Sequence, residues 1–157
     1  MSKDAELIID SKQVDANLRR IKDRVPQALL QSMRTATEYL RGYVVKYKLT
    51  GQYLKAHSGG AGLAGSIKSE AQLTQDGVVG RVGSNLKYAR VHELGIWKGV
   101  KVKAHSRNMN GKLVSVREHM RMMKLVARHY LLHSLQETTP NLQRVLGQEF
   151  WSEVTSK

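Results

Sequence analysis

The apolar residues of the N-terminal third of the chain recur at every third or fourth position. They run Val14, Leu18, Ile21, Val25, Leu29, Met33, Ala36, Leu40 and Val44. This spacing keeps one helix face apolar for about eight turns, so it predicts an amphipathic helix over residues 14–44. Pro26 either kinks this helix or begins a second one at its first position. Residues 6–10 are interpreted as a short strand, and Thr50-Gly51 as the end of the helical pattern.

The middle of the chain alternates apolar and polar residues in two short runs. Residues 67–73 and 78–82 each predict a strand, and Asp76-Gly77 between them predicts a hairpin turn. Residues 85–95 predict a short helical turn. Ahead of the strands, residues 57–66 hold four glycines in ten positions and predict a mobile loop. These glycines are Gly59, Gly60, Gly62 and Gly65.

A six-residue segment occurs twice with small changes. Residues 102–107 read Val-Lys-Ala-His-Ser-Arg, and residues 116–121 read Val-Arg-Glu-His-Met-Arg. Between the copies lies Asn110-Gly111, the strongest short-range signal for a β-turn. The segment therefore predicts a hairpin whose strands begin at Val100 and at Leu113.

The faces of this hairpin depend on the length of its loop. In both strands the cationic side chains occupy odd-numbered positions and the valines even-numbered ones. A two-residue turn would pair Arg107 with Val114 and mix the faces. A loop one residue longer, with Gly111 in a left-handed bulge, pairs odd with odd. We therefore predict the bulged loop, with one cationic and one apolar face.

The C-terminal segment predicts a last helix over residues 139–157, with Thr139 as its N-cap and Pro140 at its first position. Its apolar stripe consists of Leu142, Val145, Leu146, Phe150 and Val154. The coarse order is helix, hairpin, basic hairpin and helix. This order predicts an α+β fold with antiparallel strands, in a single domain that covers residues 1–157.

Charge concentrates in the basic hairpin. The chain has a formal net charge of +13, and residues 98–128 contribute +8 through nine Lys or Arg and one acid, Glu118. Such a segment indicates an anionic partner, either nucleic acid phosphates or an acidic groove on a neighbouring subunit. The alternative is that these charges are only solvated and protect an exposed strand edge from aggregation. The candidate partner-binding residues are Lys98, Lys101, Lys103, His105, Arg107, Arg117, His119, Arg121, Lys124 and Arg128.

Several motifs that resemble catalytic or metal sites fail on inspection. Residues 60–65 match G-x-G-x-x-G, but a helix precedes them and a strand follows, the reverse of a dinucleotide site. His92-Glu93 lacks the second histidine of a zincin, because position 96 is Ile. His129 and His133 have helical metal-ligand spacing but lack a third ligand nearby. The chain has no cysteine. We therefore expect no enzyme, no cofactor and no metal.

The composition also bears on location. No segment approaches the roughly 18 apolar residues of a membrane span, and the N-terminus lacks the apolar core of a signal peptide. We expect synthesis in a reducing cytoplasm and no membrane partner.

Six segments, taken in order, resemble a known family. They are residues 49–55 (Leu-Thr-Gly-Gln-Tyr-Leu-Lys), Gly65-Ser66-Ile67, Val82-Gly83-Ser84, Tyr88-Ala89 with residues 92–95 (His-Glu-Leu-Gly), the repeat at residues 102–107, and residues 127–131 (Ala-Arg-His-Tyr-Leu). Together they resemble the tail-completion, neck or head–tail joining proteins of long-tailed double-stranded-DNA bacteriophages, including the related virion-morphogenesis proteins. The resemblance covers roughly residues 14–137. The family's compact Thr-Gly-x-Leu is stretched here at residues 58–63, and its Ala-Arg-Pro-Phe-Leu lacks the proline.

The resemblance implies a helix packed on an antiparallel sheet and a subunit of a ring, commonly a hexamer. Such rings lie between the connector and the tail tube, and genomic DNA passes through the lumen. The resemblance thus implies a structural virion protein without an active site, made in the host cytoplasm. The glycine-rich loop and the basic hairpin would be assembly elements that become ordered against neighbours. The residues do not distinguish a neck ring from a tail-terminating ring.

Overall fold

The computed structural model describes residues 11–49 and 62–156 and has the expected α+β fold. The expectations for residues 6–10, for Thr50-Gly51 and for Gly59 and Gly60 lie outside the described residues. In chain order the elements are α1 (Ser11–Tyr43), the π-helical turn η1 (Val44–Lys48), α2 (Gly62–Ser66), β1 (Ile67–Thr74), β2 (Gly77–Ser84), α3 (Lys87–Leu94), β3 (Ile96–Val102), β4 (His105–Met109), β5 (Lys112–Val116), β6 (His119–Leu125) and α4 (Tyr130–Thr155).

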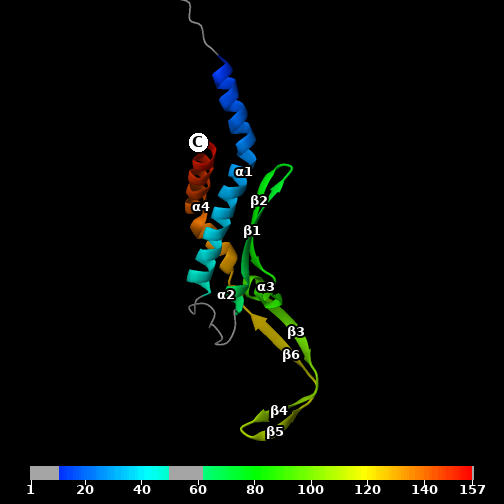
Figure 1. Cartoon of the computed structure of the whole chain (residues 1–157). Helices are drawn as coiled ribbons and strands as arrows, with labels where there is room; N and C mark the ends of the chain where they lie inside the picture. Colours follow the sequence, from blue (N-terminus) through cyan, green and yellow to red (C-terminus); the bar gives the residue numbers. More distant parts are fainter. Residues whose placement is uncertain (1–10, 50–61, 157) are drawn as a thin grey trace, which may run out of the picture.

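The two long helices α1 and α4 lie side by side and form the spine of the body (Figure 1). Most of their buried residues are small, among them Ala28, Ser32, Ala36, Ser134 and Thr138. Small side chains let two helices approach closely. The buried hydroxyls are satisfied within their own helices, since Ser32 donates to the Ala28 carbonyl at 2.6 Å and Thr138 to the Ser134 carbonyl at 2.7 Å. Burying these hydroxyls therefore leaves no donor without a partner.

Glu137 of α4 ties that helix to the end of α1. Its carboxylate accepts hydrogen bonds from Lys48 Nζ at 2.7 Å and from the Tyr43 hydroxyl at 2.8 Å. The bonds from Lys48 and then Tyr43 lower the pKa of the Glu137 carboxyl, and the same contact raises the pKa of Tyr43. These polar contacts link the two helices at the C-terminal end of α1.

α1 is one continuous helix through Pro26, which excludes a second helix beginning there. Its N-terminal part extends beyond the C-terminal end of α4 (Figure 1). Arg24 of α1 lies beside the C-terminal end of α4, where its guanidinium donates a hydrogen bond to the Ser156 carbonyl. Beyond that point the predicted apolar stripe is uncovered, and Val14, Leu18 and Ile21 are exposed. The stripe is therefore buried only where other elements lie against it.

The hairpin β1–β2 packs on α1 and confirms both predicted strands. Thr74 pairs with Gly77, so Gln75-Asp76 form the turn, one residue earlier than predicted. Gly80 of β2 faces α1. A Cβ atom at Gly80 would lie 2.6 Å from both Met33 Sδ and Thr37 Cγ2, so the absence of a side chain allows this close approach.

The apolar core lies where the end of α1 meets the hairpin and α4. Its buried residues are Val44, Leu49, Leu63, Ile67, Ala89 and Tyr130. Leu63 belongs to α2, so the predicted mobile loop at residues 57–66 is wrong for its last five residues. Burial of Leu63 and a 2.7 Å hydrogen bond from Ser66 Oγ to the Leu63 carbonyl hold one helical turn despite two glycines.

α4 begins at Tyr130 and not at Thr139, so the predicted start of the last helix is wrong. Pro140 lies inside the helix. The Thr139 hydroxyl donates to the Leu135 carbonyl at 2.7 Å, one turn earlier, instead of capping a helix start. The cap comes from Glu93, which is distant in the sequence.

Candidate interaction surface: the basic hairpin and its root

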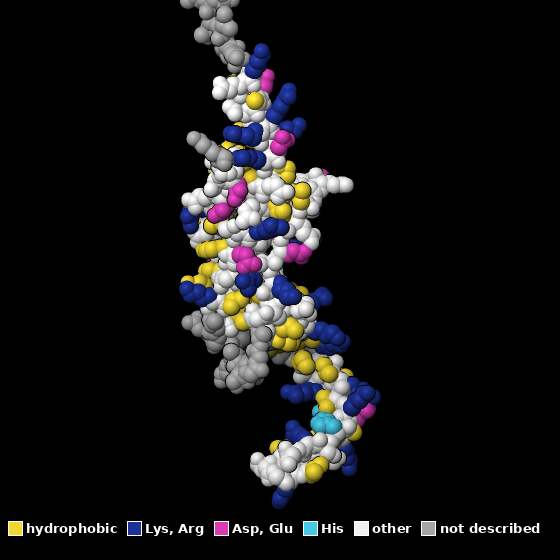
Figure 2. Space-filling view, in the orientation of Figure 1, with side chains coloured by type: hydrophobic (Ala, Val, Ile, Leu, Met, Phe, Trp, Pro, Cys, Tyr) yellow, Lys and Arg dark blue, Asp and Glu magenta, His cyan; other side chains and the backbone are white. Residues whose placement is uncertain are grey.

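The basic hairpin extends away from the body of the molecule. We call residues 96–125, which contain β3, β4, β5 and β6, the arm. In Figure 1 the arm leaves the body beside the N-terminal end of α4, bends, and ends in the β4–β5 tip. In the described part of the chain β3 packs chiefly on β6, and β4 on β5. Lys and Arg side chains surround the arm, with exposed apolar side chains between them (Figure 2).

The two strand pairs of the arm share one register. Val102 lies opposite His119 in the first pair, and His105 lies opposite Val116 in the second. Partner residue numbers have the same sum in both pairs, so the register continues across residues 103–104 and 117–118. We call these residues, which separate the two strand pairs, the break. The two copies of the repeat therefore face each other, and each histidine lies opposite the valine that opens the other copy. A local pseudo-two-fold axis through the ribbon thus relates the two copies of the sequence repeat.

The break at the centre of this pseudo-two-fold is itself symmetric. His105 Nδ1 lies 2.9 Å from the Lys103 carbonyl oxygen, and His119 Nδ1 lies 2.9 Å from the Arg117 carbonyl oxygen. Because a carbonyl only accepts, each Nδ1 carries the proton. The same local bond on both strands interrupts the ladder where the arm bends (Figure 1).

The loop at the tip is the two-residue turn, so the predicted bulge is wrong. Met109 pairs with Lys112, and Arg107 with Val114. Asn110 and Gly111 have φ of 53° and 81°, the left-handed pair of a type I′ turn. The bulge was expected because it would separate cationic from apolar residues. Both faces of the ribbon are exposed to solvent, so there is no buried face to favour that separation. The conformational preference of Asn-Gly therefore decides the register.

Both faces of the arm are consequently mixed, and the predicted separation into one cationic and one apolar face is also wrong. On one face Lys101 and Lys124 lie among Trp97, Met120 and Met122. On the other face, Lys98 pairs with Met123 and Arg121 with Val100. Each face therefore alternates cations with large apolar side chains.

The apolar side chains of the arm are strongly exposed. Leu113 at the tip is 80% exposed, Trp97 is 75% exposed and Met120 is 68% exposed. Lys124 Nζ lies 5.1 Å from the centre of the Trp97 ring. Lys101 pairs with Glu118, the one acid of the arm, at 2.8 Å. Exposed contacts of this kind contribute little to stability, and an isolated two-stranded ribbon is marginal in water.

The arm is anchored to the body at a junction we call the root, residues 92–95 and 127–132. The backbone N–H of Arg128 donates to the His92 carbonyl at 2.9 Å, and that of His129 to the Glu93 carbonyl at 3.1 Å. The Glu93 carboxylate then accepts from the backbone N–H groups of Leu131 at 2.9 Å and Leu132 at 3.1 Å. Glu93 thereby caps the first turn of α4 and places negative charge at its N-terminus.

The root contains two titratable groups with perturbed acidity. Burial, and then the charge of Glu93, raise the pKa of Tyr130 to about 12. Burial, and then the charge of Arg128, lower the pKa of His92. Within the described residues, His92 Nδ1 is buried without a hydrogen-bond partner. The root is therefore partly desolvated, unlike the arm it holds.

Four of the segments that resemble the family meet in two pairs. Ile67 lies opposite Ser84 and Lys68 opposite Gly83, and the Ser66 and Ser84 hydroxyls lie 2.7 Å apart. The segments at residues 92–95 and 127–131 form the root. These four segments are separate in the sequence but are neighbours in the structure.

The predicted partner-binding residues are gathered on one ribbon but not on one face. Arg128 lies in the root, Lys103 and Arg117 lie at the break, and the other seven are on strands. Gly62 and Gly65 lie in α2. Sequence reasoning missed the exposed residues Met120 and Met122, although the alternation of methionines with cations was a readable signal. It also missed the capping role of Glu93, for which no local signal exists.

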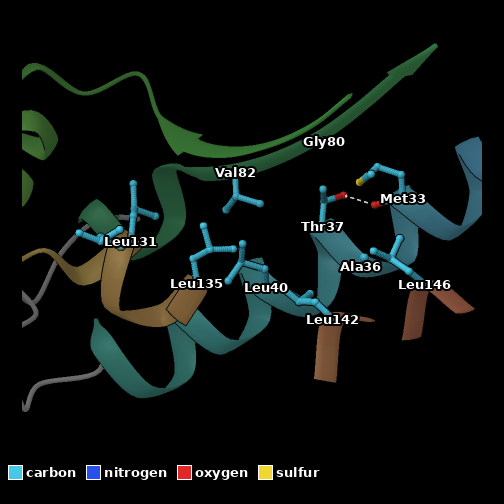
Figure 3. Close-up of a pocket in the computed structure, with 11 residues that line it drawn as sticks. Met33, Ala36, Thr37, Leu40, Gly80, Val82, Leu131, Leu135, Leu142 and Leu146 are labelled. Carbon is cyan, nitrogen blue, oxygen red and sulfur yellow. Dashed lines mark hydrogen bonds between the residues drawn. The ribbon is translucent and has the colours of Figure 1, made fainter. Parts of the chain in front are cut away.

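A groove opens on the body between α1, β2 and α4. Its volume is about 320 Å³, and apolar side chains line it (Figure 3). Figure 3 shows Leu40 of α1, Val82 of β2 and Leu135 of α4 directed toward one another across it. Leu132 and Leu135 remain partly exposed there. The groove thus adds to the uncovered apolar residues of the arm and of the N-terminal part of α1.

Comparisons with protein-family models, curated proteins and solved structures gave no match. Over residues 11–49 and 62–156, no set of three His, Asp, Glu or Cys side chains is placed to hold a metal ion. None of the helices in these same ranges combines the length and the apolar character needed to cross a membrane.

Proposed function

We propose that this chain is a structural virion protein of a long-tailed bacteriophage, acting at the head–tail junction or the tail end. It would form a homo-oligomeric ring, a hexamer by the resemblance, and dock onto connector and tail-tube proteins. Genomic DNA in the lumen is a further contact. Its locations would be the host cytoplasm during assembly and then the virion.

The observation that carries this proposal is the arm. It is a long ribbon without a core of its own, with leucine, tryptophan and methionine exposed among cations on both faces. Apolar surface of this extent gains free energy when a partner covers it. Alternating cations and apolar groups fit a protein surface that combines apolar and acidic side chains. The arm therefore supports docking onto protein neighbours.

The order of the family motifs supports the class of assembly. Four of the motifs pair with one another, two at the β1–β2 hairpin and two at the root, so they form coherent parts of one fold. The root holds both ends of the arm. In this proposal the body makes up the bulk of each ring subunit, and the arm reaches its neighbours.

The proposal is tested in phage particles. An epitope-tagged chain should co-purify with virions on a density gradient, and labelling should locate it at the junction or tail end. Reversing the charge of Lys103, Arg107, Arg117 and Arg121 should leave the fold intact but leave heads unjoined to tails. The matched control reverses Arg19, Arg20, Lys22 and Arg34, which lie on α1. Joined, infectious particles from the arm variant would contradict a docking role for the arm.

One observation favours a second candidate, a DNA-binding protein. The cations lie on both faces of a projecting two-stranded ribbon, and a ribbon of this kind can enter the major groove. Binding through phosphates falls steeply with salt, with log K linear in log salt concentration. Tight duplex binding at physiological salt by a chain that never joins a particle would favour this candidate over the first.

A further inference from the structure

The groove and the tip of the arm have complementary chemistry. The groove is lined by leucines of α4, among them Leu142 and Leu146. Glu149 and Glu153 continue the same helix face, because each follows Leu146 at helical spacing. A ligand that fills this groove and reaches that end of α4 would therefore combine apolar and cationic side chains.

The tip of the arm has this composition. Leu113 is the most exposed large apolar side chain of the tip, and Met109 is exposed on the opposite face of the same hairpin. Arg107 and Lys112 share the face of Met109. The tip thus combines exposed apolar side chains with a cation on each strand.

Net charge makes α4 the favourable side of the groove for such a ligand. α4 has three carboxylates and one arginine, a net charge of −2. By contrast, α1 has seven Lys or Arg and three acids, a net charge of +4. A cationic hairpin is therefore attracted to α4, and the leucines there provide the apolar contact.

The tip of the same molecule is in the wrong place to fill the groove. The arm leaves the body at the N-terminal end of α4 and extends away from it, whereas the groove lies between the helices and β2 (Figures 1 and 3). We propose that the tip of one copy docks in the α1–β2–α4 groove of a second copy. This inference rests on the proposed ring-forming function and names its subunit contact. The contact joins two different surfaces, so it is head-to-tail and can close into a ring.

The experiment uses two variants of the full chain, each lacking one side of the contact. Leu113→Gln removes the most exposed apolar side chain of the tip and keeps the groove. Leu135→Lys places a cation in the groove and keeps the tip, and Leu132→Lys repeats that change at a second partly exposed leucine. Leu18→Gln is the matched control, since Leu18 is exposed on α1 outside both surfaces. Circular dichroism verifies the fold of each variant.

Sedimentation velocity should show that the wild type and Leu18→Gln self-associate. Each single variant should do so roughly 30-fold more weakly, as for loss of a hot-spot residue. An equimolar mixture of the tip and groove variants should form a heterodimer and nothing larger, because one intact contact remains. This mixing result is specific to a head-to-tail contact.

Three results would overturn the inference. They are a wild type that stays monomeric up to about 100 µM, tip and groove variants that associate like the wild type, and a mixture that stays monomeric. A monomer that binds random duplex DNA through the arm would in addition favour nucleic acid as the arm's partner. If both variants form rings that still enter virions, the proposed function stands and only this subunit contact fails.

Discussion

The Glu93 carboxylate accepts a 2.9 Å hydrogen bond from the backbone N–H of Leu131, 38 residues further along the chain. The whole arm lies between these two residues. The contact therefore closes a loop at the base of the arm and begins α4 at the same point. One side chain thus determines both where a helix starts and where a long ribbon leaves the body.

Removing this carboxylate should destabilise the fold and loosen the arm. We expect Glu93→Ala to lower the free energy of unfolding by about 1–2 kcal/mol, the usual cost of a lost helix cap. Glu93→Gln should have an intermediate effect, because it keeps one acceptor oxygen but loses the charge. Urea denaturation measures the loss, and limited proteolysis of the arm measures the loosening. An Ala variant as stable as the wild type would show that other groups hold the root.

The glycine next to Glu93 and Leu94 offers a second test of the root. Gly95 has φ of +73°, and a Cβ atom there would lie 2.7 Å from the Ala127 backbone nitrogen and 2.8 Å from the Leu125 carbonyl oxygen. Gly95→Ala should therefore cost about 2 kcal/mol or more, through left-handed strain and backbone overlap. Gly147→Ala is the control, since it lies within α4 with open space around it. That change should stabilise the chain by about 0.5–1 kcal/mol.

Tyr130 predicts a loss of stability at alkaline pH. Its folded pKa of about 12 lies above the ordinary value of 10.0, so folding favours the neutral phenol. The corresponding stability is present below pH 10 and is lost as the pH rises through 12. Tyr130→Phe cannot ionise, so its melting temperature should fall less steeply over this range. The control is Tyr39→Phe on the exposed side of α1, whose profile should follow the wild type. Parallel profiles for all three proteins would contradict the prediction.

The parts of the fold that were predictable depend on local signals. The periodicity of residues 14–44 identified α1, and the alternation around Asp76-Gly77 identified β1 and β2. Asn110-Gly111 marked the tip of the arm. Its register was mispredicted because separation of charge from apolar residues was given more weight than turn chemistry. Separation of charged from apolar residues sets the register only where one face of a hairpin is buried, and neither face of the arm is buried.

The other errors arise from contacts distant in the sequence. Thr139-Pro140 is a sound local signal for a helix start, but Glu93 starts α4 earlier and the helix accommodates Pro140. Gly62 and Gly65 favour a loop locally, but burial of Leu63 holds a helical turn. In the candidate site, the cations were predictable from composition. The apolar residues between them became significant only once their exposure was visible.

The shared face of Lys101, Lys124, Met120 and Met122 gives a way to separate protein docking from DNA binding. We compare two double variants, Lys101→Gln with Lys124→Gln and Met120→Gln with Met122→Gln. A protein partner covers both kinds of side chain, so each double variant should reduce incorporation into particles. Phosphates contact only the cations, so the methionine variant should leave duplex DNA affinity unchanged.

Salt dependence adds a quantitative criterion to this comparison. Fluorescence anisotropy with a labelled duplex at several salt concentrations gives the slope of log K against log salt. The lysine variant should reduce the magnitude of that slope by about 2, one for each phosphate contact removed, if the arm binds DNA. If the arm instead docks onto protein, the methionine variant should fail in particle assembly. Its slope of log K against log salt should equal that of the wild type. A methionine variant that assembles normally, beside a lysine variant that does not, would mean that the arm acts through charge alone.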